Sequence, residues 1–138
     1  MTFLIDTNVA VHLRDGDPAI TARVAHLTAQ PVISVLTRVE LEGGVYRDPR
    51  NVAALRPRLD LMLEQLQELP FTTAEAVVYA RIVQQCGYSC PRVIDRMIAA
   101  TAIRANATLI TINSRDFRGI EGLRLEDWSL GGTGGNGC

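Results

Sequence analysis

Residues 3–8, with the sequence FLIDTN, decide the fold of this chain. Three apolar residues predict a short buried strand, and Asp6 follows them directly. In open sheets of parallel strands, ligands bind beyond the carboxyl ends of the strands. Because Thr7 and Asn8 can cap the helix that follows, we expect the Asp6 carboxylate to have a function instead of a structural duty. A carboxylate in dry surroundings is costly unless it is paired, hydrogen-bonded or bound to a cation.

Short apolar segments alternate with helical patterns along the rest of the chain, which predicts an α/β fold with a parallel sheet flanked by helices. We expect strands at residues 2–6, 31–34, 69–71, 109–112 and 123–125, and helices at residues 9–14, 18–29, 36–46, 51–67, 73–85 and 92–106. The pair Gly43-Gly44 predicts a break or an end in the third helix.

Length and composition predict one domain over residues 1–130 and a disordered, glycine-rich tail at residues 131–138. The chain has 47% hydrophobic and 21% charged residues, which is typical of globular proteins. We find no apolar stretch of the ~18 residues that a membrane span needs, and no signal peptide, so we expect a cytoplasmic protein. The net charge of −1 gives no overall attraction for nucleic acid, although all fourteen basic residues are arginines.

Three further acidic residues occupy positions where a structural role explains them poorly. Glu40 lies on the inward stripe of its helix if Ser34 is the N-cap. Asp95 begins a helix face that is otherwise made of Ile and Ala, and such small residues let a helix approach a sheet closely. After the strand at 109–112, either Asn113 or Asp116 can reach the same place, and turn formation is the competing explanation for both.

Carboxylates that converge in this way predict a site for Mg²⁺, with Mn²⁺ as a substitute, and phosphoester hydrolysis as the chemistry. We expect Asp6 and Asp95 to bind the metal directly, and Glu40 to bind it through water or to orient the attacking water. Thr7 can support a metal ligand by a hydrogen bond. The arginines nearest in sequence to these acids are candidates for contacts with the phosphates of the substrate: Arg92, Arg96, Arg115 and Arg118.

The chain resembles the PIN-domain ribonucleases, and among them the VapC-type toxins of bacterial toxin–antitoxin pairs. The matching stretches are residues 3–8, 34–41, 95–102, 109–117 and 120–123, together with Trp128. The resemblance implies a three-layer α/β/α fold with a five-stranded parallel sheet. It also implies a magnesium-dependent endoribonuclease, the toxin of a type II pair, whose cognate antitoxin covers the active site.

By motif position, the resemblance implies that Asp6, Glu40 and Asp95 are the acidic metal ligands. Members of the family differ in whether the last acid stands at the position of Asn113 or at that of Asp116. Asn113 is neutral, so Asp116 is the substitute and Asn113 a supporting residue. A homodimer within the toxin–antitoxin complex is also expected. Residues 21–27 and 51–69 carry more apolar side chains than one sheet face needs, and burial in a homodimer or against the antitoxin would account for the excess.

Two other readings of the pattern remain open. A phosphotransfer domain of the haloacid-dehalogenase or response-regulator type also begins with an acid at a strand end. Such proteins use a lysine near the phosphate, and this chain has no lysine. The second alternative is an inactive PIN-like module that only binds RNA or a protein.

Overall fold

The computed structural model describes residues 1–129, and the tail predicted at residues 131–138 lies outside the described residues. Five strands form one parallel sheet in the order β3-β2-β1-β4-β5. They are β1 (Thr2–Ile5), β2 (Val32–Ser34), β3 (Gln67–Leu69), β4 (Ala107–Thr111) and β5 (Arg124–Asp127). The predicted five-stranded parallel sheet is therefore confirmed.

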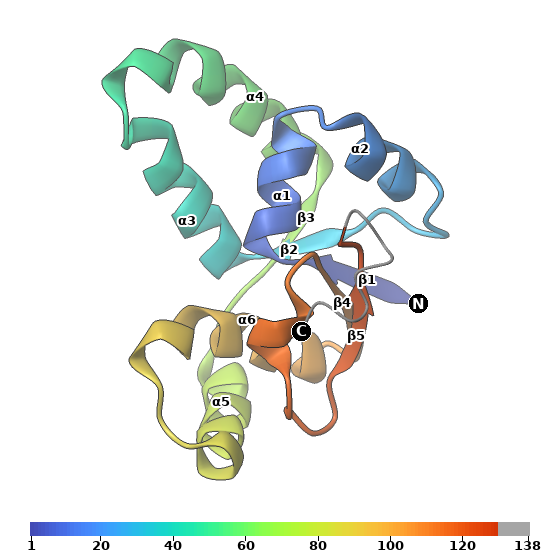
Figure 1. Ribbon diagram of the computed structural model, residues 1–138, viewed down its shortest axis with the longest axis vertical. Helices are drawn as coiled ribbons and strands as arrows, with labels where there is room; N and C mark the ends of the chain where they lie inside the picture. Colours follow the sequence, from blue (N-terminus) through green and yellow to red (C-terminus); the bar gives the residue numbers. More distant parts are fainter. Residues whose placement is uncertain (130–138) are drawn as a thin grey trace.

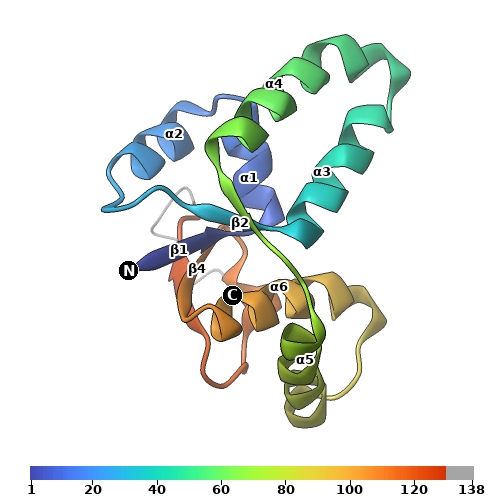
Figure 2. The same ribbon diagram turned by 180° about the vertical axis from the view of Figure 1, so that it is seen from behind.

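Helices cover both faces of this sheet, as the predicted three-layer arrangement requires (Figures 1 and 2). The α-helices are α1 (Thr7–Arg14), α2 (Pro18–Ala25), α3 (Val35–Tyr46), α4 (Val52–Gln65), α5 (Thr73–Cys86) and α6 (Val93–Arg104). Short 3₁₀ turns lie at η1 (Pro49–Asn51), η2 (Cys90–Arg92) and η3 (Ser114–Phe117). Helices α1 to α4 lie on one side of the sheet, and α5 and α6 on the other. No helix within residues 1–129 is both long and apolar enough to cross a membrane.

Side chains alternate between two cores, one on each face of the sheet. Ile5 and Ile110 are buried in the core beneath α1 to α4, whereas their neighbours Leu4 and Leu109 are buried in the core that α5 and α6 cover. Because both faces of the central strands are buried, these strands read as continuous apolar runs. This is why the sequence pattern identified them.

Several boundaries differ from the prediction. The expected break at Gly43-Gly44 is wrong, because α3 continues to Tyr46 and is held on both sides of the glycines by buried Leu41 and Val45. Helix α2 ends four residues early, at Ala25. Strand β3 begins and ends two residues before the predicted range of 69–71. As an edge strand, β3 is pinned by one neighbour only.

The predicted helix ends on α5 are confirmed. Thr72 and Glu75 form a reciprocal capping box, in which the backbone N–H of Thr72 donates to Glu75 Oε1 at 2.7 Å. Gly87 ends the helix with a φ of +83°, a conformation that glycine adopts without strain. The sequence signals at this helix were local, and the structure uses them as expected.

The apolar side chains of α4 do not form the surface excess that suggested a partner. Leu59, Met62 and Leu66 are buried in the core beneath α1 to α4, and Leu55 and Leu63 pack against it. The chain thus covers most of this apolar surface itself, although Leu55 and Leu63 stay half-buried, and the homodimer remains a prediction.

Replacing Ile110 with Ala tests this core. Ile110 is 0% exposed at the centre of the sheet, so the substitution leaves a cavity. We expect the free energy of unfolding in urea to fall by about 2–5 kcal/mol. Leu61→Ala is the control, since Leu61 is 56% exposed and its loss should change stability by less than about 0.5 kcal/mol. Equal losses for the two variants would contradict the burial described here.

Candidate active site

Asp6 lies at the carboxyl end of β1, where it caps α1. Its Oδ1 accepts a hydrogen bond from the backbone N–H of Val9 at 3.0 Å, and the residue is 4% exposed. The expectation that Asp6 has no structural duty is thus wrong, because Thr7 is already the first helical residue. Burial raises the pKa of Asp6, and the charge of Asp116 raises it further; hydrogen bonds from Thr111 and Val9 oppose the shift.

The strand order explains why distant acids meet here. Strand β1 pairs with β4, and the chain reaches β2 on one side of β1 and β4 on the other. Such a reversal of strand order opens a crevice at the carboxyl edge of a sheet. Asp6 follows β1, and Asp116 follows β4 in the turn η3. The two carboxylates therefore follow neighbouring strand ends, and the charge of Asp116 raises the pKa of Asp6.

Asp95 lies in the first turn of α6. Ala99, Ala100 and Ala102 are fully buried in this helix, so the backbone of α6 lies close to the sheet, as the sequence predicted. Burial raises the pKa of Asp95 to about 6, and the charges of three other carboxylates add to the shift: Asp116, Asp6 and Glu40. Arg92 opposes it. The other three predicted acids thus all act electrostatically on Asp95.

Asp116 is held by two neighbours. Its Oδ2 accepts from Asn113 Nδ2 at 2.6 Å, and its Oδ1 lies 3.3 Å from Arg92 Nη1. Asn113 is exposed, and its own backbone N–H donates to Thr111 Oγ1 at 2.9 Å. Of the two alternatives left open by the sequence, Asp116 is the charged group beside Asp6 and Asp95, and Asn113 orients it.

Glu40 is exposed, so its predicted place on an inward stripe of α3 is wrong. It nevertheless faces the site, because Thr7 Oγ1 donates to Glu40 Oε1 at 2.5 Å. Thr7 Oγ1 also lies 3.1 Å from Thr37 Oγ1. Since Thr7 uses its only hydroxyl hydrogen in the hydrogen bond to Glu40, Thr37 must be the donor in the second bond.

Sequence reasoning missed two threonines of this site. Thr37 is fully buried one helical turn before Glu40, and Thr111 is fully buried at the end of β4 and bonds Asp6. Each had a signal in the sequence: Thr37 precedes Glu40 by three residues on the same helix, and Thr111 ends the strand that leads to Asn113. A hydroxyl in an apolar segment next to a candidate acid is the pattern to look for.

The four predicted arginines lie together. Arg92, Arg96, Arg115 and Arg118 line one pocket of about 300 Å³ with Asp116 and Ile120. Arg96 differs from the others, because it is 7% exposed and its guanidinium donates to the carbonyl oxygen of Gly87. Arg96 therefore holds the end of α5 against α6.

The donor chemistry of the site fits a hard divalent cation. Carboxylate oxygens are the ligands that Mg²⁺ prefers, and a cation would relieve the repulsion that raises the pKa of Asp95 and Asp6. Within residues 1–129, no three acidic, histidine or cysteine side chains are arranged so that all of them could hold one metal ion. Mg²⁺ keeps several waters in most proteins, so a site with few direct protein ligands suits it.

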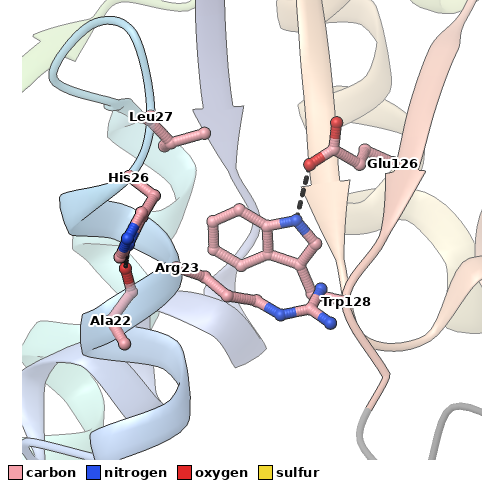
Figure 3. A pocket seen from close by; sticks show the side chains of 6 residues that line it. All are labelled: Ala22, Arg23, His26, Leu27, Glu126 and Trp128. Carbon is pink, nitrogen blue, oxygen red and sulfur yellow. Dashed lines mark hydrogen bonds between the residues drawn. The ribbon is translucent and has the colours of Figure 1, made fainter.

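A second hollow, of about 360 Å³, lies between α2 and the end of β5 (Figure 3). Trp128 Nε1 donates to Glu126 Oε2 at 2.5 Å, and the guanidinium of Arg23 lies 5.6 Å from the centre of the indole ring. None of the four predicted acids lines it. Figure 3 shows the indole packed between Leu27 and Arg23, so we assign these contacts to stability.

A family model described as PIN domain matches residues 3–123. The chain belongs to the PIN-domain family. This PIN domain is 33% identical to Ribonuclease VapC1 of Rickettsia felis over 91% of its own length and 95% of the relative. It is 29% identical to Ribonuclease VapC2 of the same organism over 93% of its length and 98% of the relative.

A solved structure gives the same result for the fold of this PIN domain. VapBC2 from Rickettsia felis, bound to a DNA fragment from its promoter, is similar with a TM-score of 0.81 and 26% sequence identity. The likeness covers 93% of this chain and 99% of that chain. The resemblance to VapC-type PIN domains and the predicted fold are thereby confirmed, whereas the roles of the individual site residues stay predictions.

The raised pKa of Asp95 predicts how stability depends on pH. The folded protein holds the Asp95 proton up to a pH of about 6, whereas the unfolded chain releases it near 3.8. Stability is therefore lost as the pH rises through this window. We expect metal-free wild type to lose about 1–2 kcal/mol between pH 4 and pH 7 that Asp95→Asn does not lose, after allowance for solvent screening. Parallel urea denaturation curves in EDTA measure the difference; identical pH profiles would contradict it.

Proposed function

We propose that this PIN domain is a divalent-metal-dependent endoribonuclease, with Mg²⁺ as the metal, and the toxin of a toxin–antitoxin pair. The observation that carries the proposal is that the charges of Asp116, Asp6 and Glu40 all act on Asp95 at the strand-order reversal. Burial and these three carboxylates raise the pKa of Asp95 to about 6, and four acids gathered at such a cost need a reason to be together. Relatives over almost the full length are named ribonucleases, which supports the same chemistry.

Asp6, Asp95 and Asp116 are the residues that would hold the metal, in part through water molecules bound to it. When bound, a divalent cation supplies a water molecule of lowered pKa and positive charge beside the phosphate. The chain provides the rigid part of the arrangement: the backbone N–H of Val9 fixes Asp6, and Asn113 fixes Asp116. Orientation of this kind lets the carboxylates keep their places when a charged substrate arrives.

Glu40 is suited to take the proton of the attacking water. Its Oε1 is engaged by Thr7, and within residues 1–129 no hydrogen-bond partner of Oε2 is found. The exposed position of Glu40 keeps Oε2 in contact with solvent, where a water molecule can donate to it. Thr37 anchors Thr7 from the buried side of α3. We infer that Thr37 and Thr7 position Glu40 and do not touch the substrate.

We also propose that the partner of this chain is a cognate antitoxin. The solved structure of VapBC2 supports it, because that structure holds a VapC-like chain within a VapBC complex. A homodimer stays a prediction from the family resemblance alone, since the apolar residues of α4 pack inside this chain.

An RNA- or protein-binding module without activity is the second candidate. Two observations favour it: Asn113 is neutral, and in the described residues 1–129 no three acidic, histidine or cysteine side chains are arranged to hold one metal ion. The module would keep the fold and lose hydrolysis, so a cleavage assay separates the two candidates.

Cleavage of structured RNA by the purified protein with Mg²⁺ tests the proposal. We expect Asp95→Asn and Asp6→Asn each to lower the cleavage rate at least ~100-fold, because each removes a charged metal ligand. Asn is the better replacement at position 6, since its side-chain oxygen can still cap α1. The measurement is the initial rate of fragment formation on a labelled RNA.

Glu64→Gln is the matched control for that experiment. Glu64 is an exposed carboxylate on α4, and its loss should leave the rate unchanged. Cleavage that persists in Asp95→Asn, or a wild type that binds RNA without cutting it, would count against the nuclease and for the binding module.

Thermal unfolding tests the metal site without measuring activity. Because a ligand that binds only the folded state stabilises it, millimolar Mg²⁺ should raise the Tm of the wild type by a few degrees. Asp95→Asn should show a clearly smaller rise, because it lacks one of the charges. The same Mg²⁺ effect on both proteins would mean that the cation binds elsewhere.

A further inference from the structure

We infer that the arginine pocket, lined by Arg92, Arg96, Arg115 and Arg118, binds the RNA phosphate next to the one that is cut. The inference rests on the proposed function, because it places the second phosphate relative to the acidic site. The pocket has a volume of about 300 Å³ and gathers four guanidinium groups around one carboxylate, that of Asp116. Nothing else in its lining carries charge, since its sixth member is Ile120.

Two separate parts of the chain build the pocket. Arg92 ends the turn η2, and Arg96 lies in the first turns of α6. Arg115 belongs to η3, and Arg118 follows that turn directly. Helix α6 and η3 are in contact, and this brings the two pairs of arginines together. A chain with a net charge of −1 thus presents a concentrated basic spot beside its acidic edge.

The arginines do not have the same role. Arg96 is buried and bonded to the carbonyl oxygen of Gly87, so its guanidinium is already engaged by the protein. Arg118 is exposed, and its guanidinium has no hydrogen-bond or ion-pair partner within residues 1–129. Arg92 is 37% exposed, and its 3.3 Å contact with Asp116 uses only Nη1. Arg118 and the rest of the Arg92 fork are therefore placed to donate to phosphate oxygens.

Asp116 makes the pocket a part of the active site. This carboxylate lines the arginine pocket, and its charge raises the pKa of both Asp95 and Asp6. It is thus the border between the acidic group and the basic pocket. A phosphate held by the arginines lies on the β4 side of the acids, whereas Glu40 and Thr7 lie on the α3 side. RNA bound here would run across the acids from α3 toward η3.

The electrostatics of the site call for such a pocket. RNA carries a negative charge at each phosphate, and the four carboxylates repel it. Arginine offsets this repulsion with a planar fork that can bind two phosphate oxygens at once. Because the contact is to a phosphate, it is expected to strengthen RNA binding without regard to sequence.

RNA binding in EDTA tests the pocket separately from cleavage. The probe is a fluorescein-labelled single-stranded oligoribonucleotide, and fluorescence anisotropy gives its Kd over a series of salt concentrations. We expect Arg118→Gln to weaken binding about three- to tenfold and to make the slope of log K against log[salt] shallower by about 0.7, as the loss of one phosphate contact predicts. Arg118→Lys keeps the charge and should recover most of the slope.

Arg58→Gln is the control. Arg58 is an exposed arginine of α4, on the opposite side of the sheet from α6, and its loss should change neither Kd nor slope. The inference is overturned if Arg118→Gln behaves like wild type, if Arg58→Gln weakens binding equally, or if the wild type does not bind the probe. A wild type that cuts RNA while Arg118→Gln binds normally would leave the nuclease intact and remove only the pocket. If the wild type does not cleave RNA but Arg118→Gln makes the salt slope shallower, the pocket is supported and the nuclease proposal fails.

Discussion

The parallel pairing of β1 with β4, from Thr2 opposite Ala107 to Ile5 opposite Ile110, sets two strand ends side by side at the middle of the sheet. The segments that follow these two strands therefore begin at neighbouring positions. Asp6 comes after one strand and Asp116 after the other, and α6 returns along the sheet with Asp95 in its first turn. Without this register the acids would be four unrelated surface residues.

Gathering these charges lowers the stability of the fold, and hydrogen-bond donors at fixed positions offset part of this loss. Burial and mutual repulsion raise the pKa of Asp6 and Asp95, yet Asp6 also receives hydrogen bonds from Val9 and Thr111. The same carboxylate therefore begins helix α1 and belongs to the site. An alanine at position 6 would remove both roles at once, so its effect on activity would not separate chemistry from folding.

The order of elements was predictable from the sequence because buried strands and amphipathic helices leave local patterns. All five strands were found within two residues, and the edge strand β3, which only one neighbour holds, is shifted by two residues at both ends. The cap at Asp6 was missed because a one-residue change in the start of α1 decides which side chain meets the free N–H groups. The predicted orientation of Glu40 was wrong because its hydrogen-bond partner Thr7 is 33 residues away in the sequence.

The pair of hydroxyls beside Glu40 has a further consequence. In the present arrangement the protons point from Thr37 to Thr7 and from Thr7 to Glu40. If Glu40 takes up a proton on its free oxygen Oε2, the engaged oxygen Oε1 still accepts from Thr7, and neither hydroxyl has to rotate. The carboxyl group then keeps its hydrogen bond in either charge state. It can therefore be protonated and deprotonated during turnover while its side chain stays in one rotamer.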